Sequence, residues 1–174
     1  FPRPTLLSIV PPQAATGVCR NAALVASLNQ RMNLERFDTH AYLELQRING
    51  APITLASCAQ QSGHTVVNLA VQSAGSPISW LWQNMRFWIQ YVIPFASADE
   101  IPVVFSCRLP LNFQQEDTVV GANVLGIISQ ALLPGSQYRF VIEGDQNNPT
   151  DATASGVVSE NQAGLLQGQA HTFT

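Results

Sequence analysis

The chain contains no lysine, and its 174 residues are only 11% charged, with 8 arginines against 11 acidic side chains. Soluble domains usually carry about 25% charged residues. Amides supply much of the remaining polar surface, because the sequence has 16 glutamines and 11 asparagines. A protein that binds nucleic acid by neutralising phosphates needs a basic stripe, which eight scattered arginines do not form. A disordered chain needs low hydrophobicity and high net charge, whereas this chain is 46% apolar with a net charge of −3.

Long hydrophobic runs are also missing. No stretch approaches the roughly 20 apolar residues that span a bilayer. The segment 1–7 lacks the charged and apolar regions of a signal peptide. A chain of 174 residues is long enough to bury a sizeable core, since a domain of this size hides roughly 70% of its unfolded surface. We therefore expect one domain over residues 1–174, without a membrane partner.

Cysteine is scarce, and its spacing shows no motif. Cys19, Cys58 and Cys107 are odd in number and far apart, and no C-x-x-C is present, which argues against a zinc or redox site. Such cysteines favour buried free thiols in a reducing compartment over a single disulfide. The only Asn-x-Thr triplet, at 148–150, is blocked by its central proline, which disfavours a secreted eukaryotic glycoprotein.

Alternation of residues with a period of two is the strongest positive signal. It places successive side chains on opposite faces, as a half-buried strand requires. The aromatic and β-branched content of the alternating runs agrees with strands. Four clear runs cover 64–71, 85–93, 103–109 and 137–143, and two weaker ones cover 41–48 and 124–132.

Glycine and proline, 11 of each, separate these runs. Asn49-Gly50 suits a two-residue type I′ hairpin turn, which requires Pro52 to occupy an edge or a bulge. The polar residues after Pro110 are interpreted as a loop. Several short strands without alternating helices predict an all-β fold with a single antiparallel β-sandwich.

The two ends of the chain lack clear alternation. The alanine-rich segment 21–31 has Ala22, Val25 and Leu28 on one helical face, so a short helix or irregular entry is expected there, with a first strand as the alternative. The tail is rich in Gly, Ala, Ser and Gln, which predicts an extended segment with one strand at 156–159. The domain is thus expected to carry extended segments over 1–35 and 150–174.

Groups suited to catalysis or metal binding are few. A pair such as Cys58 with His64, or Cys107 with His40, would have to meet beside an orienting group. No nucleophile motif is present. The acidic pair at 116–117 is interpreted as solvated loop charge, and no cluster completes a metal shell. We therefore expect no enzyme activity, no metal and no cofactor.

Three tryptophans, Trp80, Trp82 and Trp88, fall within nine positions. Trp80 and Trp82 share one strand face, and Trp88 lies opposite the face of Phe87 and Ile89, so that strand is expected to be covered on both sides. Packing in the core is the simplest explanation. A subunit contact is the functional one, because tryptophan is enriched at interface hot spots. Stacking on sugar rings is a third.

Five segments together resemble a known family. They are similar to the middle and closing strands of picorna-like virus coat proteins, with a small-residue entry, an alternating strand, a loop and a strand that ends in proline. The segments are 38–42 (DTHAY), 62–71 (SGHTVVNLAV), 85–94 (MRFWIQYVIP), 124–128 (VLGII) and 138–143 (YRFVIE). The resemblance covers 38–145 and points to the small capsid subunit of comovirus, fabavirus, cheravirus or nepovirus type. It implies an eight-stranded jelly roll, and segment 21–31 departs from the pattern.

The resemblance implies a structural capsid subunit of an icosahedral virion, assembled in the host cytoplasm. Its partners would be copies of itself and other coat proteins, with the packaged RNA only weakly contacted. The scarcity of charge agrees, because lysine is depleted at interface cores. Two functions of other classes suit the composition as well. They are an extracellular β-sandwich of the pilin or adhesin kind, and a carbohydrate-binding module that stacks sugars on its tryptophans.

Replacement of one tryptophan tests the interface interpretation. We expect Trp82→Ala to lower the yield and stability of assembled particles, because truncation of a hot-spot aromatic costs about 2 kcal/mol or more of binding energy. Sedimentation measures the yield, and thermal melting of the particles measures the stability. Unchanged values for both would contradict a packing role for Trp82.

Overall fold

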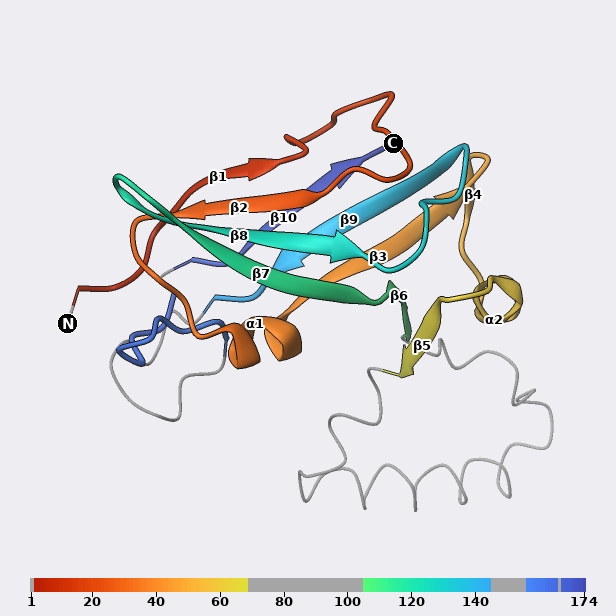
Figure 1. Cartoon of the computed structure of the whole chain (residues 1–174). Helices are drawn as coiled ribbons and strands as arrows, with labels where there is room; N and C mark the ends of the chain where they lie inside the picture. The colour runs from red at the N-terminus through yellow and green to blue at the C-terminus, as the bar shows by residue number, and fades with distance from the viewer. Residues whose placement is uncertain (1, 69–104, 145–155, 166) are drawn as a thin grey trace, which may run out of the picture. The chain divides into compact units, whose positions relative to one another are not determined.

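The computed structural model describes residues 2–68, 105–144, 156–165 and 167–174. The chain divides into two compact units, one made of Phe1–Thr65 with Cys107–Thr174 and the other of Val66–Ser106. The first unit contains most of the strands in Figure 1. No helix in the described ranges is long and apolar enough to cross a membrane.

Twelve elements follow one another along the described chain, and most are strands. Their pairings give a four-stranded sheet in the order β1-β2-β8-β7 and a six-stranded sheet in the order β10-β9-β3-β6-β5, with β4 paired to β3. Neighbouring strands run antiparallel, as predicted, and the antiparallel β-sandwich is confirmed. The elements are β1 (Leu6–Val10), β2 (Leu24–Leu28), α1 (Leu34–His40), β3 (Ala41–Ile48), β4 (Ala51–Pro52), α2 (Leu55–Gln60), β5 (Thr65–Asn68), β6 (Phe105–Leu109), β7 (Leu111–Thr118), β8 (Gly121–Ile128), β9 (Ser136–Ile142) and β10 (Gln169–Phe173).

The order of the described strands resembles that of an immunoglobulin-type sandwich. In that fold strands A, B, E and D form one sheet, and strands C, F and G form the other. Here β1 and β2 share a sheet with the hairpin β7–β8, while β3 pairs with β9, which pairs with β10. The predicted eight-stranded jelly roll, a sandwich of two Greek keys, is not confirmed by the described strands, in which β1–β2 and β7–β8 are neighbours within one sheet.

Alternate residues of the central strands form the core between the sheets. In β2 the inward positions are Leu24, Ala26 and Leu28, and all three are buried. In β9 the inward positions, Tyr138 and Phe140 among them, are buried in the same alternating pattern. A fully buried aliphatic or aromatic side chain stabilises the fold by about 1.5–3 kcal/mol. The same alternation that predicted the strands therefore places every second side chain in the core.

The helix α1 closes one end of the core. Its N-cap is Asn33, whose side-chain oxygen accepts hydrogen bonds from the backbone amides of Glu35 and Arg36. The cap fixes where the helix begins and directs Phe37 inward, where it is fully buried. The ring of Phe37 meets the ring of Phe113 edge to face, with 5.3 Å between centroids.

Three predictions for single segments are wrong. Segment 21–31 contains strand β2 rather than the expected helix, in agreement with the strand alternative, since Leu24 and Leu28 fit either period and only the partner strands β1 and β8 decide between them. The polar residues after Pro110 form strand β7, whose edge position tolerates polar side chains on its outer face. The strand of the tail is β10, not 156–159, where isolated bridges link Val158 to Gly164 and Ser159 to Met32.

The predicted hairpin turn is confirmed. Asn49 and Gly50 have φ of 50° and 81°, the left-handed conformation that a type I′ turn requires and that Asn and Gly tolerate best. The turn joins β3 to β4, and Pro52 in β4 pairs with Arg47. Since β4 pairs with β3 alone among the described strands, Pro52 occupies the expected edge.

The cysteines differ from the prediction of buried free thiols. Cys58 of α2 and Cys107 of β6 form a disulfide with 5.9 Å between their Cα atoms, and both residues are buried. Cys19 is the free cysteine of the described chain, and it is exposed. The odd number and wide spacing of the cysteines were poor guides, because the fold brings α2 and β6 together across a sequence separation of 49.

The N-terminal segment reaches both sheets. It pairs with β2 through β1, and beyond Val10 it runs along the outer edge of β10. There the amide of Ala14 donates to the carbonyl of Thr172 at 2.7 Å, and the amide of Thr174 donates to the carbonyl of Ala15 at 2.9 Å. Ala15 forms a parallel bridge with Phe173. The edge of β10 is therefore covered rather than open.

Tyr138 closes the connection between β8 and β9. Its ring is buried at the start of β9, and its hydroxyl accepts a hydrogen bond from the backbone amide of Leu133 at 3.1 Å. Immunoglobulin-type sandwiches carry such a tyrosine corner, in which the hydroxyl bonds to backbone a few residues upstream. The bond satisfies a half-buried amide that would otherwise lack a partner in the connection.

We expect Tyr138→Phe to lower the free energy of unfolding by about 1–3 kcal/mol, because it leaves the Leu133 amide without its acceptor. Tyr42→Phe is the matched control, since the Tyr42 ring keeps its contact with Arg108 after loss of the hydroxyl. Urea denaturation of both variants measures the difference. Equal effects at the two positions would show that the corner does not stabilise the fold.

Candidate functional site

The structure places the sequence-predicted residues in different settings. Trp80, Trp82 and Trp88 lie outside the described residues, and so does the strand predicted at 85–93. The proposed Cys–His pairs do not form, because Cys58 and Cys107 are bonded to each other. No group of three His, Cys, Asp or Glu side chains within the described ranges is arranged to hold a metal ion.

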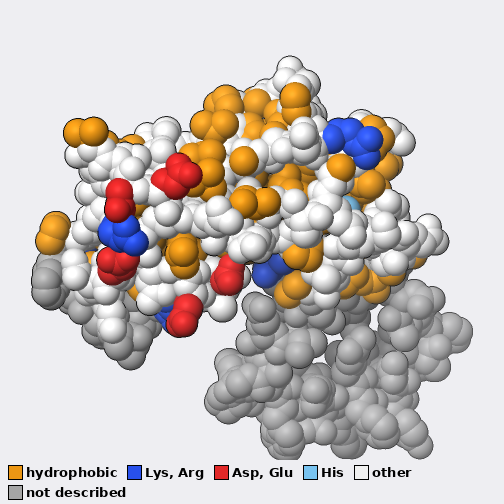
Figure 2. Space-filling view, viewed as in Figure 1, with side chains coloured by type: hydrophobic (Ala, Val, Ile, Leu, Met, Phe, Trp, Pro, Cys, Tyr) orange, Lys and Arg blue, Asp and Glu red, His pale blue; other side chains and the backbone are white. Residues whose placement is uncertain are grey.

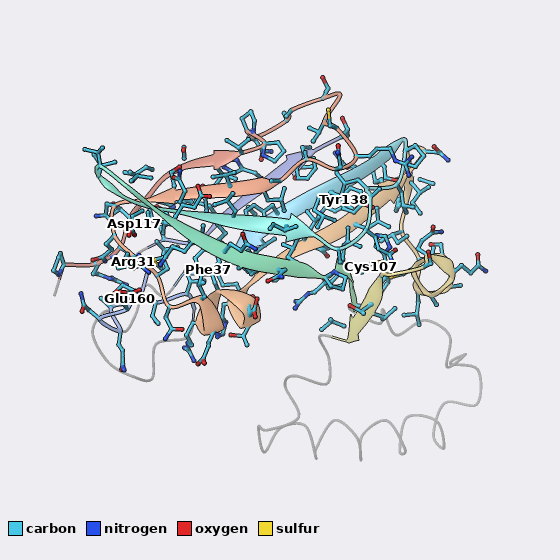
Figure 3. The ribbon with its side chains drawn as sticks, viewed as in Figure 1. Arg31, Phe37, Cys107, Asp117, Tyr138 and Glu160 are labelled. Carbon is cyan, nitrogen blue, oxygen red and sulfur yellow. A yellow bond between two sulfur atoms is a disulfide. The ribbon has the colours of Figure 1, made fainter. Side chains whose placement is uncertain are left out.

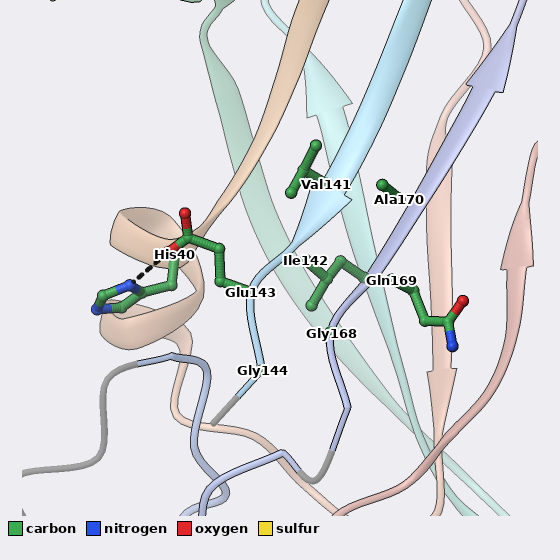
Figure 4. Close-up of a pocket in the computed structure, with 8 residues that line it drawn as sticks. All are labelled: His40, Val141, Ile142, Glu143, Gly144, Gly168, Gln169 and Ala170. Atoms are coloured by element: carbon green, nitrogen blue, oxygen red, sulfur yellow. Dashed lines mark hydrogen bonds and ion pairs between the residues drawn. The ribbon is translucent and has the colours of Figure 1, made fainter. Parts of the chain in front are cut away.

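His40 pairs with an acid at the end of β9. Its Nδ1 lies 2.9 Å from Oε2 of Glu143, and the pair lines a shallow hollow of about 500 Å³ together with Gly144 and Gly168 (Figure 4). The two glycines let the backbones meet, since a Cβ on Gly144 would lie 2.2 Å from the amide nitrogen of Gly168. A carboxylate orients an imidazole in many catalytic sites, but the lining here contributes no nucleophile.

His64 is attached to the tyrosine corner. Its Nε2 lies 3.2 Å from the hydroxyl of Tyr138, and its Nδ1 lies 3.3 Å from the carbonyl of Ser62. The hydroxyl already accepts from the amide of Leu133, so it donates its own proton to Nε2, which assigns the neutral tautomer with the proton on Nδ1. Burial lowers the pKa of His64 below its usual 6.5, with partial opposition from the Ser62 carbonyl.

An ion-pair cluster joins three separate segments. Arg31 lies between Asp117 of β7 and Glu160 of the tail, as Figure 3 shows, with 2.7 Å from its Nε to Oε1 of Glu160. Next to it, the amide of Met32 donates to the side chain of Gln115 in β7. All three charged side chains of the cluster are well exposed, so their pairing contributes little to stability. The structure places Asp117 in strand β7, whereas the sequence predicted a loop there.

The outer faces of the two sheets differ in chemistry. On the second sheet, Glu44 of β3 lies opposite Arg139 of β9, with 2.7 Å between Oε2 and the guanidinium, and Arg108 stacks 3.7 Å above the Tyr42 ring. On the first sheet, the register aligns Val10, Val25 and Leu125 in one apolar cross-strand row. The next row holds Ser27 and Asn123, which are hydrogen-bonded to each other, so the first sheet carries one apolar row beside a polar one.

The hairpin between β7 and β8 extends this apolar character to its end. Val119 and Val120 form the two-residue turn, and their exposed fractions are 105% and 68%. Figure 2 shows hydrophobic side chains at this end and over β1, β2 and β8. Sequence reasoning missed these valines. The available signal was a Val-Val pair in a polar stretch where turn residues such as Gly, Asn or Asp are expected.

No family model, no curated protein and no solved structure matches this chain.

Protonation of His64 links pH to stability. Because its pKa is lower in the folded protein than the usual 6.5, the unfolded chain binds more protons between the two values. The contribution of neutral His64 to the free energy of unfolding is therefore complete above about pH 6.5. It is lost as the pH falls through the pKa that His64 has in the folded protein. We expect His64→Gln to reduce the difference between the urea midpoints at about pH 7.5 and about pH 5. A His64 ring that titrates above 6.5 by NMR would contradict this assignment.

Proposed function

We propose that this chain is a structural, non-catalytic β-sandwich subunit that works outside the reducing cytoplasm, in a surface assembly of the pilin or adhesin kind. The observation that carries the proposal is the buried disulfide between Cys58 and Cys107 within an immunoglobulin-type sandwich. Disulfides form and persist in oxidising compartments, and many cell-surface domains have this sandwich architecture.

The disulfide has a structural use that supports this assignment. It closes a loop over a sequence separation of 49 residues, which by chain entropy stabilises the fold by about 4 kcal/mol. It also links α2, which carries Cys58, to β6, which carries Cys107 and pairs with β3 at Leu43–Leu109 and Glu44–Arg108. Such a covalent link between two elements persists where thiols are kept oxidised.

A virus capsid subunit is the second candidate, with the lysine-free, weakly charged composition as the observation in its favour. The immunoglobulin-type strand order and the disulfide both weigh against it, because the resemblance implied a jelly roll assembled in a cytoplasm. The two candidates differ in the particle they form. A fibre or single subunits fit the first, and an icosahedral shell fits the second.

The exposed thiol of Cys19 gives a direct test of location. We expect a maleimide that does not cross membranes to label Cys19 on intact cells that produce the protein, because the thiol faces solvent. Cys19→Ser is the control and should abolish the label. Peptide mapping without reductant should recover the Cys58–Cys107 link from the same cells. Labelling only after lysis, with Cys58 and Cys107 reduced, would contradict the proposed function.

A further inference from the structure

The valines of the β7–β8 hairpin have no role within the described fold. Turn positions favour Gly, Asn and Asp, and β-branched residues are poorly suited to them. Val119 and Val120 also bury little surface, since both are exposed. Neither turn chemistry nor packing explains two adjacent valines at this position. Two adjacent valines with this much exposed apolar surface are available for contact with another molecule.

An apolar hollow lies at the opposite end of the same sheet. It has a volume of about 150 Å³ and is formed where β2 begins and β8 ends. An apolar cavity of about 150 Å³ holds a group as large as benzene, so a branched aliphatic side chain fits. Most of the lining is aliphatic: Ala22, Ala23, Ile127, Ile128 and Ala131, with Asn21, Ser129 and Gln130 at its polar side.

The charged residues near the hairpin and near the hollow have opposite signs. The exposed acids Glu116 and Asp117 precede the valines in β7, whereas the exposed Arg20 adjoins the hollow. Arg20 is held there by Leu132, whose carbonyl accepts from its Nε at 2.7 Å and whose amide donates to the carbonyl of Arg20 at 2.8 Å. In Figure 2, most acidic side chains lie toward the hairpin, and a basic group lies at the far end.

We propose that Val119 and Val120 of one copy insert into the hollow of a second copy, with Glu116 facing Arg20. Donor and acceptor lie at opposite ends of β8, so the contact is heterologous, and each copy keeps one free end of each kind. Such contacts repeat in one direction and produce a head-to-tail chain. The inference rests on the proposed function, because it supplies the contact between subunits of a surface assembly.

Two complementary variants test the contact. Val119→Asp with Val120→Asp removes the insert, and Ala23→Glu fills the hollow with a charge that repels Glu116. We expect the mass of the wild-type protein in analytical ultracentrifugation to rise with concentration beyond that of a dimer. Each variant alone should stay monomeric, and an equal mixture of the two should form dimers and nothing larger, because it retains a single working contact. Leu55→Asp, at an exposed leucine of α2, is the control and should associate like the wild type.

Exchange of the charges gives a second test that does not alter the apolar groups. Arg20→Glu and Glu116→Arg should each weaken association about tenfold, and the double variant should restore it, because the pair is rebuilt with reversed sign. Circular dichroism confirms that the variants fold. A monomeric wild type, a mixture without dimers, or a double variant weaker than both single ones would overturn the contact.

The outcomes separate this contact from the proposed function. Surface labelling of Cys19 in a protein that remains monomeric would reject the head-to-tail contact and leave the proposed function in place. Association through the valines in a protein whose Cys58 and Cys107 are reduced inside cells would support the contact and reject the proposed location.

Discussion

The burial of alternate side chains between two sheets is the constraint on which the rest of this structure depends. Leu24 and Leu28 of β2 in one sheet and Tyr138 and Phe140 of β9 in the other are all buried, and every connection must return the chain to one of these layers. The ends of the interior are closed by specific contacts. Phe37 meets Phe113 at one end, and the hydroxyl of Tyr138 holds the β8–β9 connection at the other. The buried residues of the described chain include no charged side chain, and only 11% of all residues are charged.

The fold class could be predicted from period-two alternation, because half-buried strands leave that pattern in the residues themselves. Strand order could not, since it depends on partners far away: Leu24 lies opposite Gly126 of β8, and Glu44 opposite Arg139 of β9. Strand β7 was missed because Gln115 and its polar neighbours hide the alternation at an edge. The disulfide was missed because the spacing of cysteines in the sequence does not show that α2 and β6 meet. The exposed valines of the β7–β8 turn were missed because interface hot spots are enriched in aromatic residues, whereas Val119 and Val120 are aliphatic.

The disulfide, the apolar outer row and the hairpin valines are covalent or apolar features rather than charged ones. The covalent link between Cys58 and Cys107 stabilises the fold mainly by restricting the unfolded chain. Val10, Val25 and Leu125 align across three strands of the first sheet, and lysine is absent from the whole chain. Chains with these properties are suited to contact with other protein surfaces rather than to polyanions.

The segment that crosses from β1 to the edge of β10 has a mechanical consequence. Ala15 and Phe173 pair in parallel, so the two chain ends run in the same direction along this edge. A force that pulls the ends apart therefore acts along the strands and loads the bonds from Ala14 to Thr172 and from Thr174 to Ala15 in shear. Bonds loaded in shear must break together, whereas an antiparallel hairpin pulled at its open end unzips one pair at a time. Strand β1 precedes this clamp and is loaded before it, whereas β2 and the strands that follow it up to β9 stay protected until the clamp yields.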